Sequence, residues 1–165
     1  LADRIRMLRF HGSRDKKAFD HVGYNSRLDA IHAAALRVFL PRLDEWTRLR
    51  REAAARYAEL GRGELAELPR DEPGHVYHVY AIRSPERDRL AAALAEAGIG
   101  HASHYTTPLH LQPVFRHLGY SEGDLPETER AGRENLCLPI WGGISEAQQA
   151  EVVSVLRRAA SLVEA

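Results

Sequence analysis

The chain has 165 residues, which is enough for one ordinary domain with a hydrophobic core. Lys plus Arg and Asp plus Glu each number 23, so no net charge attracts nucleic acid or an anionic membrane. No apolar run approaches a membrane span, no leader resembles a signal peptide, and the single Cys137 excludes a disulfide framework or a multi-cysteine zinc site. We therefore expect a cytoplasmic protein.

The first residues already follow a helical pattern. Leu1, Ile5 and Leu8 recur on one face, which predicts a short amphipathic helix over residues 2–9 that ends at His11-Gly12. No initiator Met or cap precedes this helix, so we expect the chain to be part of something longer. Residues 13–20 are polar and charged and predict a loop or flexible arm.

The stretch Gly23-Tyr24-Asn25-Ser26-Arg27-Leu28-Asp29 joins this loop to the next helix. An amide and a guanidinium at a helix N-terminus suit an anion, because the free N–H groups and the helix dipole favour negative charge. The alternative is that Asn25 or Ser26 only caps the helix and that Arg27 is solvated. The helix is expected to run from Leu28 to about Leu40, where Pro41 breaks or kinks it.

A second helix is expected over residues 43–60, ended by Gly61 and Gly63, and a turn-rich connection follows it. The remaining elements are then expected in this order: a strand over 75–82, a helix from Ser84 to about 97, a strand over 99–103, a loop over 104–113, a helical turn over 114–118, a helix over 126–135, a strand over 136–140, and a last helix capped by Ser145 with Val152, Val155, Leu156, Ala159 and Leu162 facing inward. This order predicts a small α/β layer, α+β-like, with a short sheet flanked by helices and preceded by a long broken helix.

Nine histidines raise the question of a metal site. His75 and His78 lie three apart on an expected strand, so they point to opposite faces. His101, His104 and His110 come from a strand end and a loop, but no HExxH pair and no Cys partner accompany them. We therefore predict no metal site.

Nucleophilic catalysis is also poorly supported by the sequence. Cys137 lies in an apolar strand, where a thiol is usually inert, and the chain has no GxSxG elbow and no Gly-rich phosphate motif. His104, Tyr105 and His110, on a proline-stiffened loop, form the best remaining polar cluster. Two interpretations stay open for this cluster: the side chains anchor the loop, or they contact a ligand.

Taken together, these segments resemble the sugar-nucleotide aminotransferases of the DegT–StrS type. The resemblance covers nearly the whole chain and keeps the family's order and spacing. It rests on His11-Gly12-Ser13, the residues from Gly23 to Asp29, Leu40-Pro-Arg-Leu-Asp-Glu-Trp46, His104-Tyr-Thr-Thr-Pro-Leu-His-Leu-Gln-Pro113 and Leu138-Pro-Ile-Trp.

The resemblance implies the C-terminal domain of a fold-type I transferase that depends on pyridoxal phosphate. Residues 1–27 would be an arm at the end of the large domain with a cofactor-reaching loop, residues 28–63 the connecting helices, and residues 64–165 the small C-terminal domain. Such enzymes form homodimers with active sites at the subunit interface. They commonly transfer an amino group from glutamate or glutamine to a nucleotide-linked keto sugar, often for deoxysugar or antibiotic pathways.

The same resemblance implies roles for five residues. Asn25 would reach across the dimer to the cofactor phosphate, where an amide N–H₂ is a suitable donor. Arg27 would lie near the substrate's phosphates or the cofactor, where a guanidinium fork suits an anion. His104, Tyr105 and His110 would line the sugar-nucleotide pocket.

The chain departs from the family in one respect. Transamination needs a lysine that holds the cofactor, and the family's lysine lies N-terminal to the region that matches. Lys16 and Lys17 are the only lysines here, and neither matches it. We therefore predict no catalytic residue in this chain and no covalent link to pyridoxal phosphate.

Two alternatives stay open beside this interpretation. The chain is either a catalytically silent fragment, or a regulatory or assembly module that pairs with a full-length homologue. The exposed seams of residues 28–60 also predict self-association.

Overall fold

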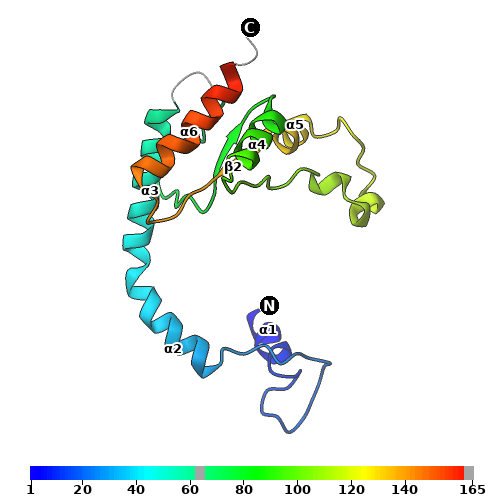
Figure 1. The fold of residues 1–165 in the computed structure, drawn as a ribbon. Coiled ribbons are helices and arrows are strands. Elements are labelled where there is room, and N and C mark those ends of the chain that lie inside the picture. Colours follow the sequence, from blue (N-terminus) through cyan, green and yellow to red (C-terminus); the bar gives the residue numbers. More distant parts are fainter. Residues whose placement is uncertain (62–65, 162–165) are drawn as a thin grey trace. The chain divides into compact units, whose positions relative to one another are not determined.

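The structure, a computed structural model, describes residues 1–61 and 66–161 (Figure 1). It divides into two compact units, Leu1–Leu43 and Asp44–Ala165. The division into segments 1–27, 28–63 and 64–165 stays a prediction, and its second boundary falls outside the described residues. In the described part of the chain, no helix is long and apolar enough to cross a membrane.

The first unit contains α1 (Ala2–Leu8), a loop, α2 (Ala30–Phe39) and the 3₁₀ turn η1 (Leu40–Arg42). The predicted first helix is therefore confirmed. The returning chain pairs with the end of α1: the Tyr24 N–H donates to the Leu8 carbonyl at 2.7 Å, and the His11 N–H donates to the Tyr24 carbonyl at 2.9 Å. These bonds hold residues 24–27 beside the helix C-terminus.

Two glycines make this pairing possible. A Cβ at Gly23 would lie 1.9 Å from the Gly12 nitrogen, and a Cβ at Gly12 would lie 1.7 Å from the His21 carbonyl oxygen. Gly12 also has a φ of +83°, in the left-handed region that favours glycine. Only residues without a side chain allow these backbones to approach so closely.

Helix α2 begins two residues later than the sequence pattern predicts. Its N-cap is Asp29, whose Oδ1 accepts from the His32 N–H at 2.9 Å, so neither Asn25 nor Ser26 caps it. This hydrogen bond is the main cause of a lowered pKa at Asp29. The interruption predicted at Pro41 is the 3₁₀ turn η1, since proline removes an N–H donor there.

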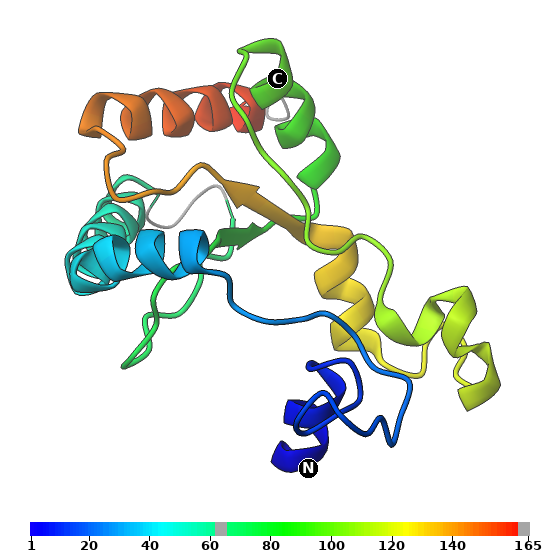
Figure 2. The same cartoon turned by 90° about the horizontal axis from the view of Figure 1, so that it is seen from below.

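The second unit is built on a two-stranded antiparallel sheet. Strand β1 (Tyr80–Arg83) pairs with β2 (Asn135–Leu138), with Tyr80 opposite Leu138 and Arg83 opposite Asn135. The helical elements are α3 (Leu43–Leu60), α4 (Arg87–Glu96), α5 (Pro126–Glu134) and α6 (Glu146–Ser161), with the 3₁₀ turns η2 (Leu109–Leu111) and η3 (Pro113–Leu118). Helices α4 and α6 lie side by side (Figure 2).

The core of this unit joins the sheet to three of its helices. Apolar burial of this kind is the main stabilising contribution to folding. The largest fully buried apolar side chains are Tyr57, Tyr80, Ile82, Leu90, Leu94, Leu136 and Leu156. The predicted fold class, a short sheet flanked by helices after a broken helix, is confirmed.

The prediction of a strand over 75–82 is wrong for its first five residues. Tyr77 has a φ of +48°, which ends any extended run. Arg51 donates to the His75 carbonyl at 2.9 Å, and Arg50 donates to the Tyr77 and His78 carbonyls at 3.0 and 3.2 Å. These carbonyls are bound by arginines of α3, so a neighbouring strand does not take them.

Other boundaries also change. Instead of a strand over 99–103 there is one isolated bridge between Ala102 and Cys137. Ser84 does not cap α4: its Oγ accepts from the Glu86 N–H in the preceding turn, and the helix begins at Arg87.

The last helix follows its prediction. The Ser145 Oγ accepts from the Gln148 N–H at 3.2 Å, and the Gln148 side chain accepts from the Ser145 N–H at 2.9 Å. The predicted inward residues are buried, namely Val152, Val155, Leu156 and Ala159. Leu162 and Gly63 lie outside the described residues.

Candidate functional site

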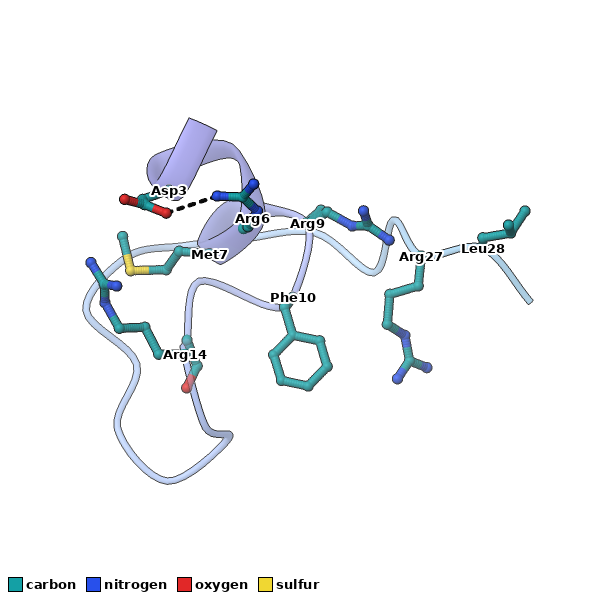
Figure 3. Close-up of a pocket in the computed structure, with 9 residues that line it drawn as sticks. Asp3, Arg6, Met7, Arg9, Phe10, Arg14, Arg27 and Leu28 are labelled. Atoms are coloured by element: carbon teal, nitrogen blue, oxygen red, sulfur yellow. Dashed lines mark hydrogen bonds and ion pairs between the residues drawn. The ribbon is translucent and has the colours of Figure 1, made fainter. Parts of the chain in front are cut away.

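An arginine-lined hollow of about 620 Å³ lies in the first unit (Figure 3). Its lining includes Arg6, Arg9, Arg14 and Arg27 with one carboxylate, Asp3, so its formal charge is +3. Such an excess of guanidinium groups attracts phosphate-bearing ligands. The sequence singled out only Arg27.

The four arginines differ in what already binds them. Arg6 pairs with Asp3 at 2.9 Å, and the Arg9 Nε donates to the Ser26 carbonyl at 3.1 Å. The Arg27 guanidinium lies 5.9 Å from the centre of the Phe10 ring, while Arg14 has no polar partner within the described ranges. Figure 3 shows Arg9 and Arg27 on one side of Phe10 and Arg14 on the other. Arg14 is therefore the cation freest to bind an anion, whereas the Nε atoms of Arg9 and Arg27 each already donate to an oxygen.

Asn25 lies next to this hollow. Its Oδ1 accepts from the Arg27 Nε at 3.3 Å, and its backbone bridges to Phe10. Its amide Nδ2 donates to no group in the part of the chain that the structure describes. The structure thus brings Asn25 and Arg27 into contact and leaves an N–H₂ donor unused beside a cationic hollow. The predicted contact of these two residues with phosphate groups stays a prediction.

A second hollow, of about 460 Å³, lies in the second unit under the loop at residues 104–112. His104 and Tyr105 line it, and the Tyr105 side chain is 76% exposed. Small residues of α5, Ala131 and Gly132, form part of its wall. Polar lining residues that the sequence reading missed are Arg83, Thr107, Gln112, Thr128 and Asn135.

His110 does not line this second hollow. Its Nε2 lies 3.1 Å from the Glu129 Oε1, and both side chains are only 5% exposed. Glu129 also accepts from the Gly123 N–H at 2.9 Å and the Leu125 N–H at 3.3 Å. This geometry favours the loop-anchoring interpretation for His110, and its contact with substrate stays a prediction.

Two other chemistries find no support in the described residues. No group of three or more His, Cys, Asp or Glu side chains gathers within 1–61 and 66–161 in a way that could hold a metal ion. Cys137 is buried in β2, and burial raises the pKa of its thiol, which disfavours the reactive thiolate.

Comparison with solved structures shows to which class of protein this fold belongs. The structure superposes on a solved DegT-type aminotransferase from Brucella abortus with a TM-score of 0.85 and 35% identity, covering 96% of this chain and 43% of that chain. The fold is therefore that of the C-terminal part of a DegT-type aminotransferase.

The chain belongs to the DegT/DnrJ/EryC1/StrS aminotransferase family, whose profile it matches over residues 1–157. It is 49% identical to a pleiotropic regulatory protein of Geobacillus stearothermophilus over 93% of this chain and 42% of that protein. It is 37% identical to dTDP-3-amino-3,4,6-trideoxy-alpha-D-glucose transaminase of Streptomyces venezuelae over 99% of this chain and 44% of that enzyme. The chain thus spans less than half the length of these relatives.

Proposed function

We propose that this chain forms the C-terminal part of an aminotransferase that acts on a nucleotide-linked keto sugar. Relatives with 37% identity are named as enzymes of dTDP-linked and UDP-linked amino sugars. The observation that carries the proposal is the cationic hollow beside Asn25, because a nucleotide sugar presents two phosphates. Glutamate or glutamine is the proposed amino donor.

The residues beside the first hollow fit a phosphate-bearing cofactor. The unused Asn25 amide donor and the Arg27 guanidinium are groups that bind phosphate oxygens. When bound, pyridoxal phosphate supplies the aldehyde that carries the amino group from donor to acceptor. Asn25 would hold its phosphate, and Arg27 the phosphates of substrate or cofactor.

The second hollow is the proposed contact site for the sugar. The exposed Tyr105 hydroxyl and the His104 ring offer a donor and an acceptor toward sugar hydroxyls. Small side chains in the wall leave room for a ring. His110 would support this loop through Glu129.

We assign no catalytic residue to this chain. Lys16 and Lys17 are its only lysines, and both are exposed in the loop between α1 and α2. The proposal therefore includes a homodimer in which this chain contributes Asn25 to a site shared between subunits. The group that bonds the cofactor would come from outside residues 1–165.

Calorimetric titration with dTDP and UDP tests this proposal. Here and below, the intact protein means the whole protein that contains residues 1–165. Arg27→Gln and Arg14→Gln each remove a charge from the hollow and are expected to weaken nucleotide binding roughly tenfold. The matched control is Arg37→Gln, which removes an exposed arginine of α2 outside the hollow. Binding that is absent in the unmodified protein, or weakened equally by Arg37→Gln, would contradict the proposal.

A regulatory function is the second candidate. It is favoured by the name of the 49% identical relative, a pleiotropic regulatory protein. A regulatory or assembly module would co-purify with a full-length aminotransferase and change its rate. A catalytically silent fragment would retain no cofactor absorbance after dialysis with pyridoxal phosphate and would bind no nucleotide.

A further inference from the structure

We infer that Asn135 is a positioning residue that fixes the loop carrying His104 and Tyr105. The inference rests on the proposed function, in which this loop contacts the sugar. Asn135 is the first residue of β2, directly after α5, and it is 7% exposed. No sequence pattern singled it out.

The Asn135 amide bonds in two directions. Its Oδ1 accepts from the backbone N–H of His104 at 2.8 Å. Its Nδ2 donates to the Ala131 carbonyl at 2.8 Å and to the Gly132 carbonyl at 3.4 Å, at the C-terminus of α5. A single side chain therefore ties the start of the loop to the end of a helix.

The Asn135 main chain adds a second tie. Its carbonyl oxygen accepts from the Ser103 hydroxyl at 2.9 Å, and the Ser103 Oγ in turn accepts from the Arg87 Nη1 at 3.0 Å. Consecutive residues of the loop, Ser103 and His104, are thus both held by Asn135. These two hydrogen bonds, one from the Ser103 hydroxyl and one from the His104 backbone N–H, fix the direction in which the chain leaves the sheet.

Close packing continues the attachment beyond His104. A Cβ at Gly132 would lie 3.0 Å from the Thr106 carbonyl oxygen and 3.3 Å from that of Tyr105. The loop backbone therefore lies against the last turn of α5. Because Asn135, His104 and Tyr105 all line the second hollow, a shift of this loop changes the shape of that hollow.

Two substitutions by side chains of similar size distinguish the hydrogen bond that Asn135 accepts from His104 from those that it donates to α5. Asn135→Leu removes both the acceptor for His104 and the donor to α5. Asn135→Asp keeps an oxygen acceptor for the His104 N–H but puts a second oxygen against the Ala131 and Gly132 carbonyls. The Asp variant should therefore be less stable but keep the loop in place. The Leu variant should be less stable and should also release the loop.

The experiment measures hydrogen exchange of the His104 amide and the affinity of the intact protein for dTDP-glucose and for dTDP. In Asn135→Leu we expect exchange at His104 to accelerate about tenfold and dTDP-glucose binding to weaken about tenfold, with dTDP binding unchanged. In Asn135→Asp, exchange at His104 should remain within about twofold of that in the unmodified protein, because the oxygen acceptor for this N–H is kept. Leu90→Ala, in the core of α4, is the control for lost stability alone.

The possible outcomes are distinguishable. Unchanged protection of His104 in Asn135→Leu overturns the inference, as does equal weakening of dTDP-glucose binding in Leu90→Ala. Lost protection without weaker dTDP-glucose binding overturns the substrate role of the loop and so the proposed sugar site. If the unmodified protein binds neither nucleotide, the proposed function fails, and exchange at His104 still decides whether Asn135 anchors the loop.

Discussion

Gly23 lies where the chain has no room for any side chain. Its missing Cβ would meet the Gly12 nitrogen at 1.9 Å, so Gly23→Ala forces the loop away from the end of α1. We expect the unfolding free energy to fall by about 1–3 kcal/mol, as for other overpacked sites. Nucleotide binding should weaken as well, because Asn25 and Arg27 follow directly.

Thermal unfolding and nucleotide titration of the intact protein measure both effects. Gly100→Ala is the matched control, because a Cβ there would meet no atom within 4 Å. Equal melting temperatures for Gly23→Ala and Gly100→Ala would show that the contact between the two glycines is unimportant.

Glu129 predicts a pH dependence of stability. Burial raises the pKa of this carboxyl, but hydrogen bonds from His110, Gly123 and Leu125 outweigh it, so the pKa lies below its usual 4.5. The ionised carboxylate therefore stabilises the folded state above about pH 4.5. This contribution is lost as the pH falls through the lowered pKa.

Melting temperatures of the intact protein and of Glu129→Gln test this prediction. The variant should melt lower at pH 6, and the difference should narrow as the pH is lowered below 4.5. Glu146→Gln, at an exposed position in the first turn of α6, is the control for removal of a surface carboxylate. A difference that is constant with pH would contradict the assigned role of the carboxylate.

At the residue scale, sequence reasoning found the loop but not its partners. The motif at residues 23–29 pointed to Asn25 and Arg27, and the structure brings these two together. The spacing of Arg6 and Arg9, three apart in the predicted helix over residues 2–9, was a usable signal for a shared face. Glu129 and Asn135 gave no signal, because the loop residues that they bind, His110 and His104, lie 19 and 31 residues away.

At the scale of elements, α3 organises the connections of the second unit. The Arg50 Nη1 donates to the carbonyls of Tyr77, His78 and Ile140 at 3.0–3.2 Å. Arg50→Met would leave all three carbonyls without this donor. We expect a loss of about 2 kcal/mol in unfolding free energy, because hydrogen bonds from charged donors are the strong ones.

Denaturant unfolding of the intact protein measures that loss. Arg48→Met is the control from the same helix, because Arg48 pairs with Glu45 and Glu52 at the surface. Exposed pairs contribute little, so this control should unfold close to the unmodified protein. Equal losses for the two variants would mean that the Arg50 bonds to the 75–79 segment are not stabilising.

Arg50 and Arg51 of α3 explain why the strand prediction failed although the helix predictions succeeded. Helical periodicity is local, and α1, α3, α5 and α6 agree with it to within a few residues. Residues 75–79 have strand composition, but whether they form a ladder depends on a partner remote in sequence. Their carbonyls bind α3 instead, and no local pattern carries that information.

At the scale of the whole molecule, the apolar side chains of α2 and η1 are exposed. No residue of α2 is buried, although most of its side chains are apolar. Ile31, Val38 and Leu40 are all more than half exposed. Exposed apolar surface of this kind favours association, so we expect the intact protein to form a homodimer through it.

Leu40→Asp tests this expectation by sedimentation velocity across a range of protein concentrations. A charge within an apolar interface should shift the protein from dimer to monomer, because burying an unpaired carboxylate is unfavourable. Val114→Asp is the matched control, since Val114 and Leu40 are each 70% exposed and Val114 lies in η3. If other parts of the same protein cover α2, Leu40→Asp lowers the melting temperature and causes no concentration-dependent dissociation, and the homodimer prediction is then wrong.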